Sequence, residues 1–362
     1  MRRVLFIFLY SIGQNDSLSS VINLNAGYHR GIILPHSSKI KNVSDSNPWG
    51  VEMNISWHLL DKESWEYCYC YPRTGVSLLY INYMNPEVIG SSISLYPYIE
   101  PYIGAERKLN ASFRFGIGPA YMTKIYDEDS NPENQFVSTH VSFVVLLRMA
   151  LNYRIDDKTG IGFTAGFNHI SNGGIKNPNL GINFPTLSLN LERYLEKPDF
   201  RQFQRQEGLR LDKDTHKFFL EYFATGKAVH KAEERYLVTG LAASYGLVVG
   251  RINGLRFGLE AIYDGAVRER IARDELPDDF VETPDYRTVG ILFGNDFLLG
   301  RFMFYQHVGI YLYEKYTYMD PVYQRYGLSY YLTKAKNISV GINLKAHRHD
   351  ADFLDFRLGY TF

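Results

Sequence analysis

The sequence predicts an all-β protein, a transmembrane antiparallel up-and-down β-barrel. The 362 residues include 29 Tyr, 23 Phe and 30 Gly, a composition that favours strands over helices. Apolar residues alternate with mostly polar or small ones over 9 residues in 51–59 and over 17 in 137–153. Strands of soluble sandwiches are about 5–6 residues long, whereas a tilted membrane strand needs roughly 9–11. Because lipid offers the backbone no hydrogen-bond partners, strands that cross it must close into a barrel.

The two ends of the chain indicate where this barrel is located. Residues 1–13 hold two arginines, a short apolar run and small residues, which predicts a secretory signal peptide, with a buried strand as the alternative. After residue 12 no apolar run approaches the roughly 18 residues of a membrane-spanning helix. The last strand alternates up to Phe362 and resembles the signal that the barrel-assembly machinery recognises. We therefore expect a multi-pass barrel in the outer membrane of a Gram-negative cell.

Charge and cysteine content exclude several classes of partner. The chain has 39 basic and 39 acidic residues and a formal net charge of zero. Since no basic patch dominates, no nucleic-acid partner is expected. Cys68 and Cys70 are separated by one residue, whereas a metal site usually has four ligands with wider spacing. A local disulfide or two structural thiols are the alternatives, and no metal or cofactor is expected.

Eight strands are expected before residue 195. They lie near residues 20–30, 48–60, 74–84, 91–102, 109–122, 136–154, 159–171 and 183–194. The connections alternate between tight turns such as 156–159 and long polar loops such as 127–135 and 172–182, as they do in bacterial barrels. If the chain starts in the periplasm, the loop after Ser171 lies at the cell exterior.

A charged segment divides the chain into two halves. Ten of the twenty residues in 196–215 are charged, which predicts a linker or a long periplasmic turn. About eight further strands follow in 216–362, where residues 328–347 faintly repeat the pattern of 151–169. We therefore expect two tandem eight-stranded units, 18–195 and 216–362. One barrel of about 14–16 strands is the alternative.

The seventh strand carries the cluster His169-x-Ser171-Asn172. His169 and Ser171 share a face with the apolar odd-numbered residues of this strand, so both side chains are expected to face lipid. This is an unusual place for polar groups, because the bilayer supplies them no partners. Residues i and i+2 of a strand are ~6.7 Å apart, so the imidazole can reach the serine hydroxyl. A hydroxyl needs such a base to become a nucleophile at neutral pH.

Asn183 is the expected third member of this cluster. It shares the lipid-facing side of the eighth strand with Leu187 and Leu189, and the loop 172–182 brings it beside His169. Glu52 and Glu100 are expected on the polar, inward face. Asn183 is therefore the candidate that orients the imidazole. The alternative interpretation of all three residues is a polar belt at the membrane interface.

A resemblance to a known family rests on the segment His169-Ile-Ser171-Asn172-Gly-Gly-Ile-Lys-Asn-Pro178-Asn179-Leu-Gly181-Ile-Asn183. It resembles the signature of the lipid A 3-O-deacylase (PagL-like) or acyloxyacyl hydrolase family of Gram-negative outer membranes. The resemblance covers about residues 20–195 and implies an eight-stranded barrel that hydrolyses an ester-linked acyl chain of lipopolysaccharide. It implies Ser171 as nucleophile and His169 as general base. It also implies that Asn179, with Asn172, holds the oxyanion through side-chain or nearby backbone N–H donors.

The chain departs from this family at one position. The best-known members carry Glu where this chain has Asn183. An Asn carbonyl accepts the imidazole N–H, but it does not offset the charge of an imidazolium. A slower enzyme is the expected consequence.

The second half lacks the cluster. His347 is followed by Arg348 and His349, without a serine two residues on, and both histidines share a polar face. Polar barrel lining is the preferred interpretation and a metal site the alternative. We expect the second unit to be non-catalytic. A further histidine, His36, belongs to a loop expected either to lie near lipid A phosphates or to be solvated.

Two functions remain to be compared. The first is a serine ester hydrolase of the outer membrane that removes an acyl chain from lipid A without a cofactor. Its partners would be lipopolysaccharide and outer-membrane lipid. The second is a non-enzymatic structural or channel-forming barrel with a vestigial site.

Overall fold

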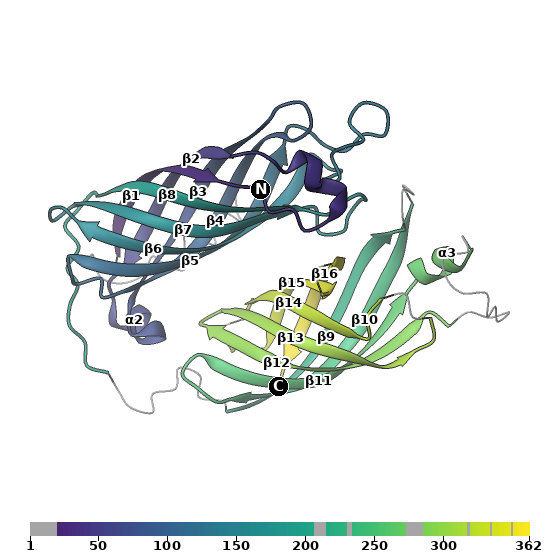
Figure 1. The fold of residues 1–362 in the computed structure, drawn as a ribbon. Coiled ribbons are helices and arrows are strands. Elements are labelled where there is room, and N and C mark those ends of the chain that lie inside the picture. Colours follow the sequence, from purple (N-terminus) through teal and green to yellow (C-terminus); the bar gives the residue numbers. More distant parts are fainter. Residues whose placement is uncertain are drawn as a thin grey trace.

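The chain forms two closed antiparallel barrels, one of β1–β8 and one of β9–β16 (Figure 1). The computed structural model describes residues 20–205, 215–229, 234–272, 285–316, 319–333, 335–348 and 350–362. The expected signal peptide and His349 lie outside these residues. Two tandem eight-stranded units are thereby confirmed, and the single larger barrel is wrong. None of the helices in the described residues has the length and apolarity needed to cross a membrane.

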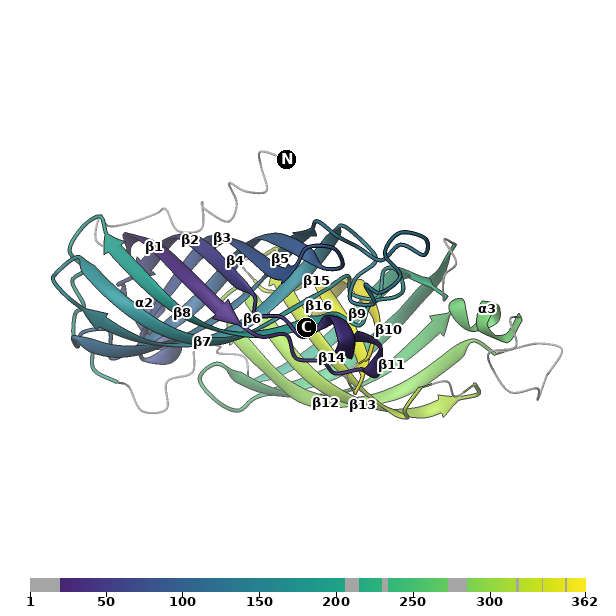
Figure 2. The same ribbon diagram turned by 45° about the horizontal axis from the view of Figure 1, so that its top comes forward.

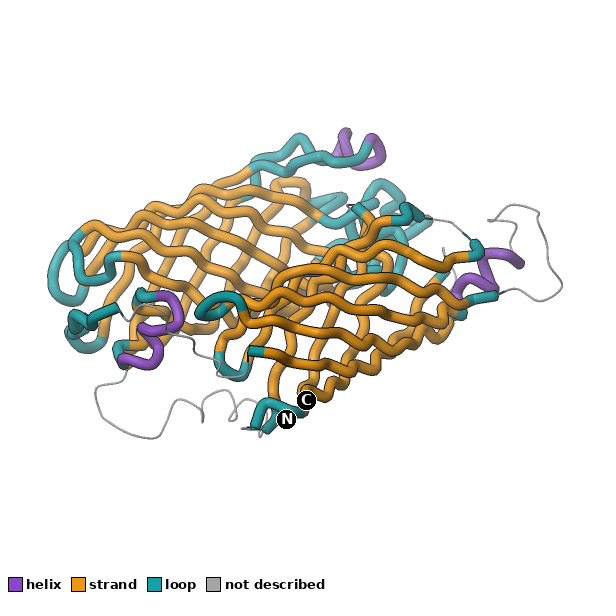
Figure 3. Tube along the Cα trace, turned by 90° about the horizontal axis from the view of Figure 1, so that it is seen from below, coloured by secondary structure: helices purple, strands orange, loops and turns teal. Residues whose placement is uncertain are grey.

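The first barrel consists of β1 (Ser20–Gly31), β2 (Trp49–Leu59), β3 (Tyr71–Asn85), β4 (Gly90–Ile103), β5 (Leu109–Met122), β6 (Val141–Arg154), β7 (Thr159–Ser171) and β8 (Ile182–Tyr194). The second consists of β9 (His216–Ala228), β10 (Arg235–Val248), β11 (Asn253–Asp264), β12 (Arg287–Leu299), β13 (Phe302–Glu314), β14 (Val322–Tyr331), β15 (Ile338–His347) and β16 (Asp350–Thr361). Three short helices, η1 (Ser38–Val43), α2 (Lys62–Cys68) and α3 (Ala266–Ala272), lie at the barrel ends (Figure 3).

Pairing of the first and last strands closes each barrel. Strand β1 pairs with β2 on one side and with β8 on the other, so that Asn25 lies opposite both Asn54 and Glu192. Strand β9 pairs in the same way with β10 and β16. Closure removes the unpaired edges that a β-sheet otherwise exposes. The faint sequence repeat occupies equivalent hairpins, β6–β7 in the first barrel and β14–β15 in the second.

The outer surface of the first barrel is apolar, as the alternation predicts. On β7 and β8 the odd-numbered side chains point outward, and Phe163 is 48% and Leu189 67% exposed. Their even-numbered neighbours Thr164 and Ser188 are buried in the interior. A continuous apolar outer face with a polar interior is the pattern of a membrane-spanning barrel.

Buried ion pairs fill the interior of the first barrel. Glu52 accepts a hydrogen bond from Arg148 at 2.6 Å, and Glu100 is bound by Arg73 at 2.9 Å and by Arg114 at 2.8 Å. All five side chains are buried. The inward position expected for both glutamates is therefore confirmed. Buried charges are tolerated only when they are paired, and here carboxylates and guanidinium groups of different strands compensate each other.

One predicted strand boundary is wrong. The strand expected from residue 136 begins at Val141, because Phe136 and Val137 belong to the preceding loop. Both side chains are fully buried. The carbonyl oxygen of Phe136 accepts a hydrogen bond from Gly181 N at 2.8 Å, so this segment packs against the loop after β7. Alternation alone does not distinguish such a packed loop from a strand.

The described part of the predicted linker, residues 196–205, packs against the first barrel, while 206–214 lie outside the described residues. Phe200 and Phe203 pack against Tyr71 and Trp65 at the end of the first barrel. The Tyr71 hydroxyl also donates a hydrogen bond to the backbone oxygen of residue 201. This segment therefore covers the barrel end that carries α2. In the same region Cys68 and Cys70 form a disulfide, the first of the two alternatives for these cysteines.

The two barrels lie beside each other (Figures 1 and 2). The rings of Phe115 on β5 and Phe304 on β13 are 5.7 Å apart. Next to α2, Arg251 Nε donates a hydrogen bond to the Tyr67 carbonyl oxygen at 3.1 Å. Outward-facing side chains of both barrels therefore take part in the contact between them.

The interior ion pairs generate a prediction about stability. Glu52→Ala leaves Arg148 as a buried cation without its nearest carboxylate, so it should reduce the free energy of unfolding by about 3–5 kcal/mol. Urea titration of the protein in lipid vesicles measures this change. Glu106→Ala is the control, because the Glu106 side chain is 41% exposed and pairs with Arg107 only at 3.6 Å. Equal unfolding midpoints for the two variants would contradict the prediction.

Candidate active site

His169 and Asn183 meet on the outer wall of the first barrel. They are direct partners in the register of β7 and β8. The His169 Nδ1–H donates a hydrogen bond to Asn183 Oδ1 at 2.6 Å. The structure thus brings together two of the residues expected in the cluster, at the end of the wall where β7 leads into the loop 172–181.

This hydrogen bond selects one tautomer of His169. When Nδ1 of a neutral imidazole carries the proton, Nε2 presents a lone pair and acts as a proton acceptor. The ring packs closely on Gly181, where a Cβ atom would lie 2.5 Å from His169 Cε1. Gly181 also has a φ of +76°, which side chains disfavour. Glycine at this position therefore leaves space for the imidazole.

Ser171 lies on the same outer face, two residues beyond His169 and opposite Phe143 on β6. Its side chain is half-buried, like that of His169. Within the described part of the chain, no hydrogen bond joins the Ser171 hydroxyl to the imidazole. Catalytic hydrogen bonds often form fully only when substrate is bound. The structure therefore places Ser171 and His169 on one face of β7, two residues apart, without a hydrogen bond between them.

Asn179 and Asn172 shape the loop that follows Ser171. The backbone N–H of Asn172 donates to Asn179 Oδ1 at 2.8 Å. The Asn172 side chain is fully buried and donates to the backbone oxygen of Lys176 at 2.7 Å and to Ser138 Oγ at 3.2 Å. Asn172 is thus engaged in holding the loop. The Asn179 Nδ2 amide group makes no hydrogen bond to any residue that the structure describes, so it remains available as a donor.

His36 is a neighbour of the cluster that sequence reasoning did not include. It follows β1 and reaches the site because Leu34 N donates to the Asn183 carbonyl oxygen at 2.8 Å. The Asn183 side-chain amide donates to His36 Nδ1 at 3.1 Å, and His36 Nε2 donates to the Leu180 carbonyl oxygen at 2.8 Å. The pairing of the first and last strands in a closed barrel was the only signal that would have found this residue.

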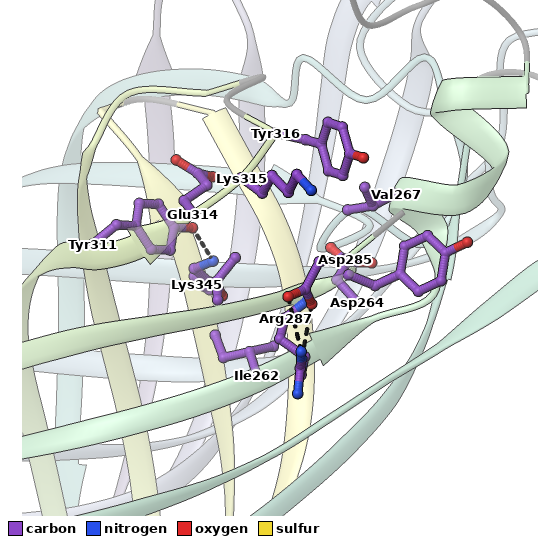
Figure 4. A pocket seen from close by; sticks show the side chains of 12 residues that line it. Ile262, Asp264, Val267, Asp285, Arg287, Tyr311, Glu314, Lys315, Tyr316 and Lys345 are labelled. Atoms are coloured by element: carbon purple, nitrogen blue, oxygen red, sulfur yellow. Dashed lines mark hydrogen bonds and ion pairs between the residues drawn. The ribbon is translucent and has the colours of Figure 1, made fainter. Parts of the chain in front are cut away.

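Among the described residues, the second barrel has no equivalent of the cluster at the end of β15. His347 points inward, is buried, and its Nε2 lies 3.1 Å from the Tyr311 hydroxyl. Figure 4 shows Tyr311 next to Lys345 in a pocket at the α3 end of this barrel, with Asp264 nearby. Within the described residues no group of three His, Cys, Asp or Glu is suited to a metal ion. The arrangement around His347 agrees with polar lining, while His349 lies outside the described residues.

Comparison with solved structures finds other barrels. The "outer membrane enzyme PagL" is 19% identical, with 46% of this chain and 97% of that chain covered and a TM-score of 0.33. Neisserial surface protein A (NspA) is 8% identical, with 48% and 96% covered and a TM-score of 0.31. A porin mutant of Rh. blastica is 8% identical, with 94% and 100% covered and a TM-score of 0.20. No curated protein sequence matches the chain.

Comparison with protein families is more informative. Residues 49–192 match the family model of lipid A 3-O-deacylase (PagL). Residues 217–362 match the model of the acyloxyacyl hydrolase C-terminal domain. The family relationship therefore extends beyond the first barrel, to which the sequence motif had limited it. Because the two models together cover most of the chain, this protein belongs to the lipid A 3-O-deacylase (PagL) and acyloxyacyl hydrolase family of hydrolases.

Proposed function

We propose that this protein is a serine ester hydrolase of the outer membrane that removes an ester-linked acyl chain from lipid A. The observation that carries the proposal is the hydrogen bond from His169 Nδ1 to Asn183 Oδ1, which turns an imidazole base toward the membrane beside Ser171. Apolar side chains cover the same wall, so a lipid substrate reaches this site directly from the membrane. The family description supports the same class of substrate.

In the first half-reaction the Ser171 hydroxyl oxygen attacks the carbonyl carbon of the ester. His169 Nε2 accepts the hydroxyl proton as the new carbon–oxygen bond forms. The tetrahedral intermediate then collapses, and the bond to the sugar oxygen breaks. The imidazolium returns its proton to that leaving oxygen, so the sugar hydroxyl is released and the acyl group stays on Ser171.

The second half-reaction repeats these steps with water. His169 Nε2 accepts a proton from the attacking water, and the acyl–serine bond breaks. The proton returns to Ser171 Oγ as the fatty acid leaves. Asn183 keeps the imidazole in the required tautomer throughout. An amide does not neutralise the imidazolium formed in each step, so this site stabilises that charge less than a carboxylate does.

The developing negative charge on the ester oxygen requires donors placed in advance. We assign this role to the Nδ2 amide group of Asn179, which is half-buried and free of other partners among the described residues. Asn172 contributes indirectly, because its backbone N–H holds the Oδ1 end of the same side chain. This hydrogen bond turns the donor end of Asn179 away from Asn172.

The other units of the chain are assigned by the same reasoning. We propose residues 1–13 as the signal peptide, 18–195 as the catalytic barrel, 196–215 as the connection and 216–362 as a non-catalytic barrel. Lipopolysaccharide in the outer leaflet is the proposed substrate partner. The strand that ends at Phe362 is the proposed contact for the barrel-assembly machinery.

Replacement of the nucleophile tests the reaction itself. Cells expressing the wild-type chain should lose one acyl chain from lipid A, and Ser171→Ala should abolish this change, because no hydroxyl remains to form the acyl intermediate. Mass spectrometry of extracted lipid A measures the acyl pattern. Ser188→Ala, an inward-facing serine on β8, should behave as wild type. Identical acyl patterns with wild type and Ser171→Ala would favour the non-enzymatic barrel.

Two substitutions of Asn179 separate its donor from its acceptor. Asn179→Asp keeps an oxygen for the Asn172 N–H but removes the Nδ2 donor, whereas Asn179→Ala removes both. Both variants should lower kcat by about 10²–10³-fold with little change in KM, as loss of one oxyanion donor does. Steady-state kinetics with detergent-dispersed lipid A provide the measurement. Normal activity of Asn179→Asp would mean that only the acceptor matters and would refute the assigned role.

A further inference from the structure

Three successive hydrogen bonds connect His169 to Asn183, Asn183 to His36, and His36 to the backbone of Leu180. His169 Nδ1 donates to Asn183 Oδ1, Asn183 Nδ2 donates to His36 Nδ1, and His36 Nε2 donates to the Leu180 carbonyl oxygen. The last group is a backbone oxygen, which only accepts. The direction of the three hydrogen bonds follows from this end point.

The donors and acceptors allow one arrangement when His36 is neutral. Two backbone oxygens compete for the single ring proton: the Leu180 oxygen lies 2.8 Å from Nε2 and the Leu34 oxygen 3.4 Å from Nδ1. The shorter contact places the proton on Nε2, so Nδ1 of neutral His36 is left as an acceptor. An acceptor at this place requires the NH₂ group of Asn183, whose oxygen then faces His169. The orientation of an amide is decided by its hydrogen-bond partners, and His36 is the partner that decides it here.

The orientation matters because an amide has two unlike ends. If Asn183 were turned around, its NH₂ group would face His169 Nδ1 and leave the imidazole proton on Nε2. A protonated Nε2 is unable to accept the Ser171 proton, and a histidine in the wrong tautomer is a poor base. A carboxylate has two equivalent oxygens and does not present this problem.

We propose that His36 is a positioning residue that fixes the Asn183 amide and, through it, the catalytically competent tautomer of His169. This rests on the proposed function and explains how Asn serves at a position where the resembled family carries Glu. Backbone hydrogen bonds determine the position of His36. Leu34 N donates to the backbone oxygen of Asn183, and Ile32 N donates to the backbone oxygen of Pro185. The segment after β1 is thereby held along β8.

Three substitutions of His36 should affect kcat to different extents, according to the hydrogen bonds that each new side chain can make. His36→Gln supplies an acceptor for Asn183 and a donor for Leu180, so kcat should stay close to the wild-type value. His36→Ala removes the selection between the two amide orientations, and kcat should fall several-fold. His36→Lys offers only donors and favours the turned amide, so kcat should fall about 10- to 100-fold, the range of a hydrogen bond to a charged group. KM should change little in all three.

The decisive comparison uses a second background. With Asn183→Glu there is no amide to turn, so adding His36→Lys should cost less than twofold in kcat. His140→Lys is the matched control: His140 also bonds a backbone oxygen, that of Met122 at 2.7 Å, in a neighbouring loop. It should leave kcat unchanged. If His36→Lys lowers kcat equally in the wild-type chain and in the Asn183→Glu variant, His36 has only a structural role and the inference is overturned.

A spectroscopic readout separates this inference from the proposed function. Nitrogen-15 NMR of histidine-labelled full-length protein in micelles, with His169→Gln to assign the signal, reports which ring nitrogen of His169 carries the proton. We expect Nδ1–H in the wild type and in His36→Gln, and Nε2–H in His36→Lys. An unchanged tautomer in His36→Lys would overturn the inference. The expected tautomers in a protein without activity on lipid A would support the inference and refute the proposed function.

Discussion

In the hydrocarbon region of a membrane, every backbone N–H and C=O group must find its partner within the protein. In this chain the requirement is met by pairing β1 with β8 and β9 with β16, so that neither sheet keeps an edge. Within the closed barrel each strand keeps a defined register with its neighbours, fixed by the alternation that directs apolar residues outward. The register places His169 opposite Asn183 and Ser171 opposite Phe143, and it directs these side chains to the outer wall. The β7–β8 register therefore pairs His169 with Asn183, and the closing β1–β8 pair brings His36 beside them.

The barrel separates its polar groups into two environments. Inside, Glu52, Glu100 and three arginines form ion pairs that compensate one another away from water. Outside, His169 and Asn183 satisfy each other at the rim of an otherwise apolar wall. The interior network supports a stable wall, whereas in the outer pair His169 Nε2 has no hydrogen-bond partner among the described residues. The ion pairs and the candidate site therefore lie on opposite faces of the same barrel wall.

The site is assembled from segments that are distant in the chain. Strands β7 and β8 supply His169, Ser171 and Asn183, and the loop between them supplies Asn179. The segment before β6 supports this loop through Phe136, and the segment after β1 contributes His36. A family that uses Glu at the position of Asn183 needs no further partner for its orientation. The amide of Asn183 instead bonds to His36, 147 residues away, and this contact is the basis of the orientation proposed for it.

Alternation with a period of two was sufficient to predict the barrel, the existence and order of its first eight strands, and the outward direction of His169, Ser171 and Asn183. It succeeds because lipid on one side and a polar interior on the other impose opposite requirements on successive residues. The sequence did not reveal that Phe136 and Val137 belong to a packed loop, that Asn172 is consumed in holding the loop, or that His36 contacts Asn183. These facts depend on closure and on contacts between loops, which bring together residues that no local pattern relates. The sequence by itself thus determined the face on which His169, Ser171 and Asn183 lie, because alternation is a local property. The tertiary structure decided which groups contact them, because those contacts join segments distant in the chain.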